Sequence, residues 1–140
     1  MLTEWYEPLS VYLFDKNPVK IEWPFSLRWA RANGLTRMVP WHFLADGEGA
    51  GADEQFNKER TDSREVRTFA KRQDCDDFAG FLVVDGVITD RVLYFHPSFA
   101  STRNEHMINS EHEDFWEFFR DVVIPDTKDW GSEADLKDQV

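Results

Sequence analysis

The sequence predicts an α+β fold, with one domain over residues 1–140, a mostly antiparallel twisted sheet, and helices packed on one face of it. The stretch Phe78–Val84 is short, apolar and rich in Phe and Val, which is typical of a buried strand. The pair Asp85-Gly86 then marks a tight turn before a second β-prone run, Val87–Phe95. A stripe of aromatic residues with helical spacing follows nearer the C-terminus.

The N-terminal quarter of the chain combines two β-prone runs, at 11–14 and 19–23, with one helix. Pro24 begins this predicted helix, and Asn33-Gly34 ends it, because glycine adopts the left-handed conformation of a helix end at little cost. Positions i, i+4 and i+7 of the helix predict that it buries the face of Phe25, Trp29 and Ala32.

Residues 45–63 are predicted to form a mobile loop with a helical turn around 54–59, since small and acidic residues dominate there. Its one large apolar side chain is Phe56. The partial alternation of residues 65–72 predicts a strand that leads into the hairpin described above.

The second predicted helix begins at Ser110, where Glu113 completes a capping box. Its apolar stripe follows the 3.6-residue period and comprises Phe115, Phe118, Phe119 and Val122. Pro125 is predicted to end this helix, and residues 126–140 then form an acidic C-terminal tail.

The chain carries 27 acidic and 16 basic residues, for a net charge of −11. Phosphate backbones repel such a surface, so direct binding of nucleic acid is not expected. Residues 104–140 hold eleven acids against three bases, and residues 58–72 hold six bases against three acids. The acid excess has two interpretations, solubility or a docking face for a basic protein.

A cytoplasmic location is expected. The single cysteine, Cys75, excludes an internal disulfide and fits a reducing compartment. The N-terminus has no basic segment followed by an apolar one, so no secretory signal is predicted. No apolar run reaches about 18 residues, and no membrane contact is expected.

Three acids, Asp74, Asp76 and Asp77, lie where a charged segment meets the central strand. Carboxylates are ligands for hard cations, and His96 is a candidate proton-transfer group beside them. The glycine and distal glutamate of a calcium loop are missing, and Asp76 and Asp77 point to opposite faces of an extended segment. Turn formation and pairing with Lys71 and Arg72 are the simpler interpretation.

Known catalytic and metal-binding motifs are missing from the sequence. The four histidines lack ligand spacing, and Cys75 has acidic neighbours that oppose a reactive thiolate. A protein with no enzymatic activity, no cofactor and no metal site is therefore expected. Among the aromatics, Trp41 and Trp116 lie outside the clear core pattern, and an exposed Trp116 would be an interface anchor.

Three segments resemble the SUKH superfamily, which includes bacterial toxin-immunity proteins and proteins similar to regulators of cell-wall assembly. Pro24-Phe25-Ser26-Leu27 followed by Asn33-Gly34 resembles a short helix near the start of these proteins. Residues 69–79, Phe-Ala-Lys-Arg-Gln-Asp-Cys-Asp-Asp-Phe-Ala, resemble a charged approach to their central strand. Residues 114–119, Asp-Phe-Trp-Glu-Phe-Phe, resemble the aromatic helix after their sheet, although Leu35 stands where many members have a second glycine.

This resemblance covers roughly residues 20–125 and implies an α+β fold and an immunity protein that neutralises a polymorphic or contact-dependent toxin. Many such toxins are nucleases with basic clefts, which suits an acidic partner. The expected docking surface comprises Asp74, Asp76, Asp77, Trp41, Glu111, Glu113, Asp114 and Trp116. Two alternatives stay open: a small metal-assisted hydrolase that uses Asp74, Asp76 or Asp77 with His96, and an intracellular regulatory scaffold.

Overall fold

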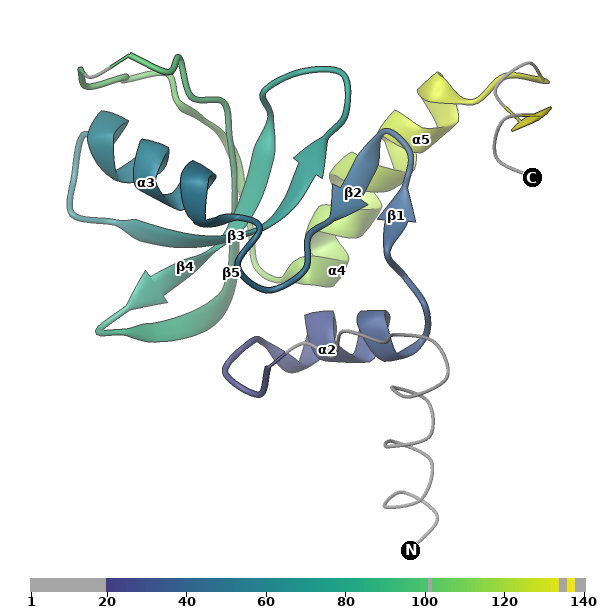
Figure 1. Ribbon diagram of the computed structural model, residues 1–140, viewed down its shortest axis with the longest axis horizontal. Coiled ribbons are helices and arrows are strands. Elements are labelled where there is room, and N and C mark those ends of the chain that lie inside the picture. The colour runs from purple at the N-terminus through teal and green to yellow at the C-terminus, as the bar shows by residue number, and fades with distance from the viewer. Residues whose placement is uncertain (1–19, 101, 134–135, 138–140) are drawn as a thin grey trace, which may run out of the picture.

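The computed structural model describes residues 20–100, 102–133 and 136–137. In this part of the chain, six strands form one antiparallel sheet in the order β1-β2-β3-β4-β5-β6, so that each strand lies beside its neighbours in sequence (Figure 1). The strands are β1 (Arg37–Met38), β2 (Trp41–Phe43), β3 (Glu65–Arg72), β4 (Phe78–Val84), β5 (Val87–Phe95) and β6 (Ile108–His112). The helical segments are α2 (Phe25–Ala32), α3 (Ala50–Glu59), α4 (Phe115–Phe118), the π-helical turn η1 (Phe119–Val123) and α5 (Ile124–Trp130).

The predicted central hairpin is confirmed, and β3, β4 and β5 have the predicted bounds. Asp85 and Gly86 both have positive φ angles, 50° and 77°. Two positive φ angles in a two-residue loop match the twist of the flanking strands, which is why Asp-Gly marks such turns. The β-prone run at 11–14 lies outside the described residues, and residues 21–23 form a turn instead of a strand.

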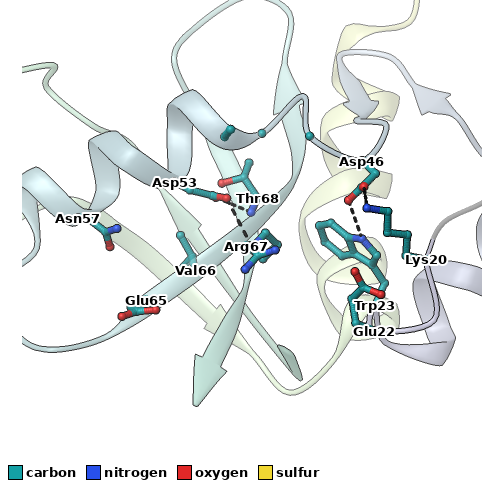
Figure 2. A pocket seen from close by; sticks show the side chains of 13 residues that line it. Lys20, Glu22, Trp23, Asp46, Asp53, Asn57, Glu65, Val66, Arg67 and Thr68 are labelled. Carbon is teal, nitrogen blue, oxygen red and sulfur yellow. Dashed lines mark hydrogen bonds and ion pairs between the residues drawn. The ribbon is translucent and has the colours of Figure 1, made fainter. Parts of the chain in front are cut away.

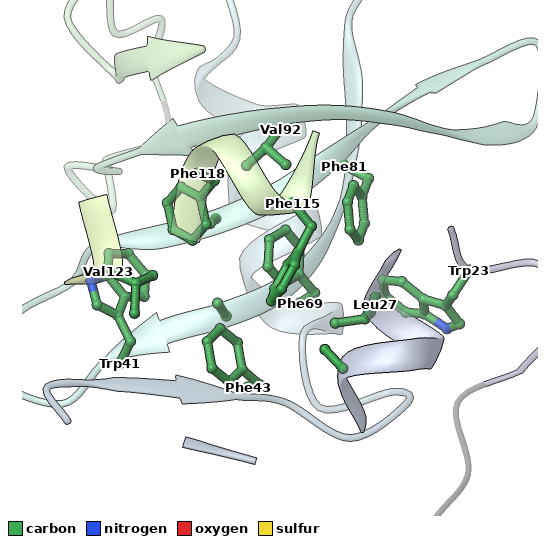
Figure 3. Close-up of a cluster of buried hydrophobic side chains, with 13 residues drawn as sticks. Trp23, Leu27, Trp41, Phe43, Phe69, Phe81, Val92, Phe115, Phe118 and Val123 are labelled. Atoms are coloured by element: carbon green, nitrogen blue, oxygen red, sulfur yellow. The ribbon is translucent and has the colours of Figure 1, made fainter. Parts of the chain in front are cut away.

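The α+β class and the antiparallel sheet are confirmed, but helices cover both faces of the sheet instead of one. One face carries a core that includes Phe69, Phe81, Phe115 and Phe118, with α2 and α4 packed over it (Figure 3). The other face carries a smaller core in which Phe56 of α3 contacts Phe95, with ring centroids 5.0 Å apart. The strands alternate their apolar residues between these two cores, because successive side chains point to opposite faces.

Helix α3 replaces most of the mobile loop that was predicted over residues 45–63, and it includes the helical turn predicted around 54–59. Helix α3 has few large apolar residues, but one of its faces, which includes Ala52 and Phe56, is buried. The start of α3 lies against β3, where Asp53 Oδ1 accepts a hydrogen bond of 2.7 Å from the Thr68 amide (Figure 2). The β3–β4 register shifts between Thr68 and Ala70, so the Asp53 carboxylate supplies a partner where the ladder is irregular.

Gly49 permits this close approach of α3 to β3. A Cβ atom at Gly49 would lie 2.5 Å from the Thr68 carbonyl oxygen, whereas one at Gly51 meets no atom within 4 Å. We expect Gly49→Ala to lower the free energy of unfolding by about 1–3 kcal/mol through overpacking. The matched change Gly51→Ala should raise it by about 0.5–1 kcal/mol, because alanine favours the helix. Urea unfolding measures both, and equal effects would contradict the close approach.

Glu59, the last residue of α3, is 0% exposed and fixes the loop that follows β5. Its carboxylate accepts five hydrogen bonds, from Gln55 Nε2, the Ser98 amide, the Ser98 hydroxyl, the Phe99 amide and Asn104 Nδ2. Its carbonyl oxygen accepts a sixth, from the Asn104 amide at 2.8 Å. Burial acts to raise the pKa of Glu59, but the hydrogen bonds outweigh burial and hold that pKa below its ordinary value.

The predicted capping box at Ser110 is wrong, because Ser110 lies in strand β6. Asp114 caps α4 instead and accepts a hydrogen bond of 2.8 Å from the Glu117 amide. The β5 run needs a pairing partner, and Ser110 pairs with Tyr94 in the β5–β6 ladder. Tertiary strand pairing therefore overrides the local helix-start signal.

The helix also continues past Pro125, where it was predicted to end. In the π-helical turn η1, the Ile124 amide donates to the Phe119 carbonyl, five residues back. This wider turn makes room for Pro125, which lacks an amide and clashes with the preceding turn of a regular helix. It also places Val123 in the core, with Val122 only partly buried. Helix α5 thus occupies the start of the predicted acidic tail.

Helix α2 ends at Asn33-Gly34 as predicted, with Gly34 at a φ of 85°. It buries Leu27 and Ala30, while Phe25 and Trp29 are exposed and stack on each other. The predicted buried face is therefore wrong except for Ala32. Arg31 explains the orientation, since its Nη1 donates a hydrogen bond of 2.8 Å to the Phe43 carbonyl. In the described part of the chain, the helices are too short or too polar to cross a bilayer.

Candidate functional site

The turn between β3 and β4, residues 73–77, holds the three predicted acids and is tied to the sheet on both sides. The Arg72 amide donates to the Asp77 carbonyl at 3.0 Å, and the Gln73 amide donates to the Pro40 carbonyl at 2.9 Å. These bonds fix the direction in which each carboxylate points. Asp76 is exposed and Asp77 is mostly buried. Residues 73–76 form a bend and not the extended segment that the alternation argument assumed.

Asp74 is bound by Arg72, in a fork of two hydrogen bonds of 2.9 and 3.0 Å. The hydrogen bond from Arg72 is the main cause that lowers the pKa of Asp74, and it also raises the pKa of Arg72. Arg72 Nη1 reaches Asp126 Oδ2 on α5 at 3.1 Å. The same oxygen accepts a 2.9 Å hydrogen bond from Trp41 Nε1, so the network joins the turn, β2 and α5.

Asp77 contacts two side chains, that of Tyr94 in β5 and that of His96, the residue after β5. The Tyr94 hydroxyl donates to Asp77 Oδ2, and His96 Nδ1 lies 2.5 Å from Asp77 Oδ1. Burial, followed by the Asp77 carboxylate, raises the pKa of Tyr94. The contact between His96 and Asp77 is the one that the proton-transfer hypothesis requires. It forms an Asp–His pair in which the Asp77 side chain is 14% exposed and that of His96 is 51% exposed.

Cys75 lies between these two networks and is predicted to react slowly. Burial, and then the negative charge of Asp77, raise the pKa of this thiol to about 11. The ordinary value is 9.0, so at pH 8 we expect alkylation by iodoacetamide to be about 100-fold slower than for the unfolded chain. The single cysteine makes mass spectrometry an unambiguous readout. Equal rates in native buffer and in denaturant would contradict the shift.

The predicted acids and His96 do not converge as a set of three metal ligands. Asp74 faces Arg72 and Asp76 faces solvent, which leaves only Asp77 against His96. Within the described ranges, the three-ligand group of this kind lies elsewhere, at His112, Glu117 and Asp121. What the turn offers chemically is one Asp–His pair and one exposed carboxylate.

The other predicted docking residues lie between β6 and α4, and only some of them are accessible to a partner. Glu111 forms ion pairs with Arg91 at 3.2 Å and Arg64 at 3.4 Å. Asp114 is engaged as the cap of α4. Glu113 and Trp116 are exposed, Trp116 by 45%, and the Trp116 ring rests on Phe115 with centroids 5.1 Å apart.

Trp41 is not an accessible interface residue. It is 0% exposed and lies beside Phe118 in the core (Figure 3). Its ring packs edge-on against Tyr94 and Phe118, with centroids 5.4 and 5.2 Å away. Its prediction as a partner-binding residue is therefore wrong. The reason is that β2 pairs with β3 and carries Trp41 beneath η1 and α5.

A separate hollow of about 450 Å³ lies between the start of α3 and the Trp23 ring (Figure 2). Charges of both signs line it, including the Lys20–Asp46 ion pair of 2.9 Å and Arg67, which lies 3.7 Å from Asp53. Burial raises the pKa of Asp53, despite its hydrogen bonds with Thr68. The two basic side chains that line the hollow pair with Asp46 and Asp53, and Glu22 and Glu65 leave its lining with a net negative charge.

Sequence reasoning named Arg72 as a partner of the candidate acids, and the structure confirms this for Asp74. It missed Tyr94 and Asp126, which lies 54 residues away from Arg72. No family model matches the chain, and searches of curated proteins and of solved structures also found no match.

Proposed function

We propose that this chain is an immunity protein, which neutralises a basic protein toxin by binding it without catalysis. The observation that carries the proposal is an exposed tryptophan beside exposed acids at the start of α4: Trp116 is 45% exposed, and Glu113 lies three residues before it. Aromatic anchors concentrate binding energy at protein interfaces. Complementary charge speeds encounter with a basic partner.

The net charge of −11 supports a basic partner. Asp76 adds a second free carboxylate, since within the described residues it makes no hydrogen bond or ion pair. We assign the docking surface to Asp76, Glu113 and Trp116. The resemblance to SUKH proteins adds the toxin as the partner, and nucleases are favoured because their clefts are basic.

The test begins with a pull-down of tagged protein from its native lysate at low and high salt, which supplies a candidate partner. The captured protein is then expressed alone and together with the immunity protein in a bacterial host. We expect growth arrest from the partner alone and rescue by co-expression. A partner that is harmless alone, or that stays lethal with a folded immunity protein, would overturn the proposal.

The docking surface has its own variants. We expect Asp76→Lys with Glu113→Lys to weaken partner binding at least about tenfold at low salt, mainly through a slower association rate. Trp116→Ala should weaken it by about 2 kcal/mol, mainly through faster dissociation. Glu54→Lys is the control, because Glu54 is exposed on α3 over the opposite face of the sheet. Asp77 is a poor choice for reversal, since it binds Tyr94 and His96.

The hydrolase alternative is supported by one observation, the 2.5 Å contact between His96 and Asp77. An Asp–His pair orients the imidazole for proton transfer. If this pair is catalytic, the wild-type protein hydrolyses a generic ester or phosphoester and His96→Ala loses that activity. The alternative fails if hydrolysis is undetectable or survives the substitution. If the chain is instead a regulatory scaffold, the partner captured in the pull-down should not arrest growth when it is expressed alone.

A further inference from the structure

We propose that His112, Glu117 and Asp121 form a binding site for a divalent first-row transition metal ion. The site uses no residue of the Asp77–His96 pair or of the docking surface, although His112 and Glu117 are next in sequence to Glu113 and Trp116. One ligand atom from each residue lies within 4.8 Å of the other two. Metal bonds of about 2.0–2.2 Å place ligand atoms roughly 3–4 Å apart. Small side-chain rotations therefore bring all three to one ion.

The fold positions these residues from three consecutive elements, β6, α4 and η1. His112 is the last residue of β6, while Glu117 in α4 and Asp121 in η1 are four residues apart on the helix that follows. Residues four apart lie on the same face of a helix. The short connection after β6, in which Asp114 caps α4, holds this helix face beside the imidazole.

The imidazole is the most constrained ligand. His112 is 7% exposed, and its ring packs against Phe118 with centroids 5.6 Å apart. Its Nε2 atom lies 2.8 Å from the Ser110 hydroxyl. When Nε2–H donates to this hydroxyl, the lone pair is on Nδ1, which is the outer-shell arrangement of metal-binding histidines.

Nδ1 lies 3.9 Å from Glu117 Oε1, beyond hydrogen-bond distance. Burial is the main cause that lowers the pKa of His112, and a neutral imidazole is the form that binds metal. With the proton on Nε2, the Nδ1 lone pair faces the carboxylate oxygens of Glu117 and Asp121, and no proton lies between them. A cation fits this gap between three electron-pair donors.

Two arginines approach the site. Arg120 forms two hydrogen bonds to Asp121, of 2.7 and 3.0 Å, and Arg91 contributes positive charge near the imidazole. The Arg120 side chain is 73% exposed, so it can release Asp121 at small cost. The mixed nitrogen and oxygen ligand set favours Zn²⁺ or Mn²⁺ over Mg²⁺ and Ca²⁺, which prefer oxygen alone.

The test titrates chelator-treated protein with zinc chloride by isothermal calorimetry and records thermal melting with and without the ion. We expect one Zn²⁺ per chain and a higher melting temperature. Glu117→Gln and Asp121→Asn should each weaken binding at least about tenfold, a loss that even outer-shell changes can cause. Asp121 is exposed, so its variant should fold even if one at His112 does not.

Two controls locate the ion. Asp129→Asn removes an exposed acid from α5, and His96→Ala removes the other histidine that contacts a carboxylate. Both should keep the wild-type affinity. The proposal is overturned if wild-type protein binds no Zn²⁺, if Asp121→Asn and Glu117→Gln bind it as tightly as wild type, or if His96→Ala alone abolishes binding.

Discussion

Glu59→Ala should destabilise the protein by about 3–5 kcal/mol, because it removes the hydrogen bonds of a buried carboxylate and leaves a cavity at the end of α3. Five donors converge on the carboxylate, and three of them come from Ser98 and Phe99 in the loop after β5. A hydrogen bond to a charged group contributes about 1.5–3 kcal/mol, and partial exposure of these donors reduces the loss per bond. Glu59→Gln keeps the side-chain volume but directs amide hydrogens at these donors, so it should also be destabilising.

The pH dependence of this effect has a definite sign. The pKa of Glu59 is lowered by folding, so its contribution to stability is fully present above the ordinary pKa of 4.5 and is lost as the pH falls through the folded value. Glu59→Gln does not titrate. The stability gap between wild type and Glu59→Gln should therefore be large at about pH 7 and smaller at about pH 3.5.

Urea unfolding at both pH values measures the gap. Glu54→Gln is the matched control on the same helix, since its ion pair with Lys58 is exposed and spans 3.7 Å. That change should cost no more than about 0.5 kcal/mol. A gap between wild type and Glu59→Gln that stays constant with pH would show that folding does not lower the pKa of Glu59.

Trp41→Ala is expected to lower the free energy of unfolding by about 3–5 kcal/mol, the usual cost of truncating a buried aromatic side chain. The ring is 0% exposed and contacts Tyr94 and Phe118. Trp41→Phe keeps much of the apolar contact but removes the hydrogen bond to Asp126. Since Arg72 still binds that carboxylate, we expect a smaller loss of about 1–2 kcal/mol.

Trp116→Ala is the control for Trp41→Ala, because its ring is 45% exposed and its loss should change stability by less than about 1 kcal/mol. The two variants separate packing from recognition. Trp41 changes should act on stability, and Trp116 changes should act on partner binding. A Trp41→Ala protein with wild-type stability would show that this tryptophan is not part of the core.

The central hairpin was predictable because its signals are local. Alternating or continuous apolar runs and an Asp-Gly turn act within a few residues, and β3, β4 and β5 have the predicted bounds. The end of α2 at Asn33-Gly34 was predictable for the same reason.

Elements whose form depends on distant partners were not predictable. Ser110 has the local signature of a helix start, yet pairing with Tyr94 makes it part of a strand. Helix α3 forms in a glycine-rich segment because Phe56 and Glu59 find buried partners on β5 and in the loop after it. The π-helical turn that carries the helix past Pro125 leaves no pattern of side-chain types.

The candidate site was predictable in part. The sequence identified Asp77 and His96 as possible partners, and the structure brings them together. It did not identify the Tyr94 hydroxyl or the contact between Arg72 and Asp126, which link residues 17 and 54 positions apart. His112, Glu117 and Asp121 were also missed, because the wrong helix start placed His112 inside a helix.

The two edges of the sheet bear on how readily another chain could pair with it. Strand β1 has only two residues, and the Thr127 hydroxyl of α5 donates to its Met38 carbonyl at 3.3 Å. Strand β6 forms the opposite edge and presents Asn109, Ser110 and Glu111 in succession. A short, partly covered edge and a polar one are poor templates for strand addition by another chain. The hydrophobic residues of the central strands are thus shielded from the cross-strand pairing that starts fibres.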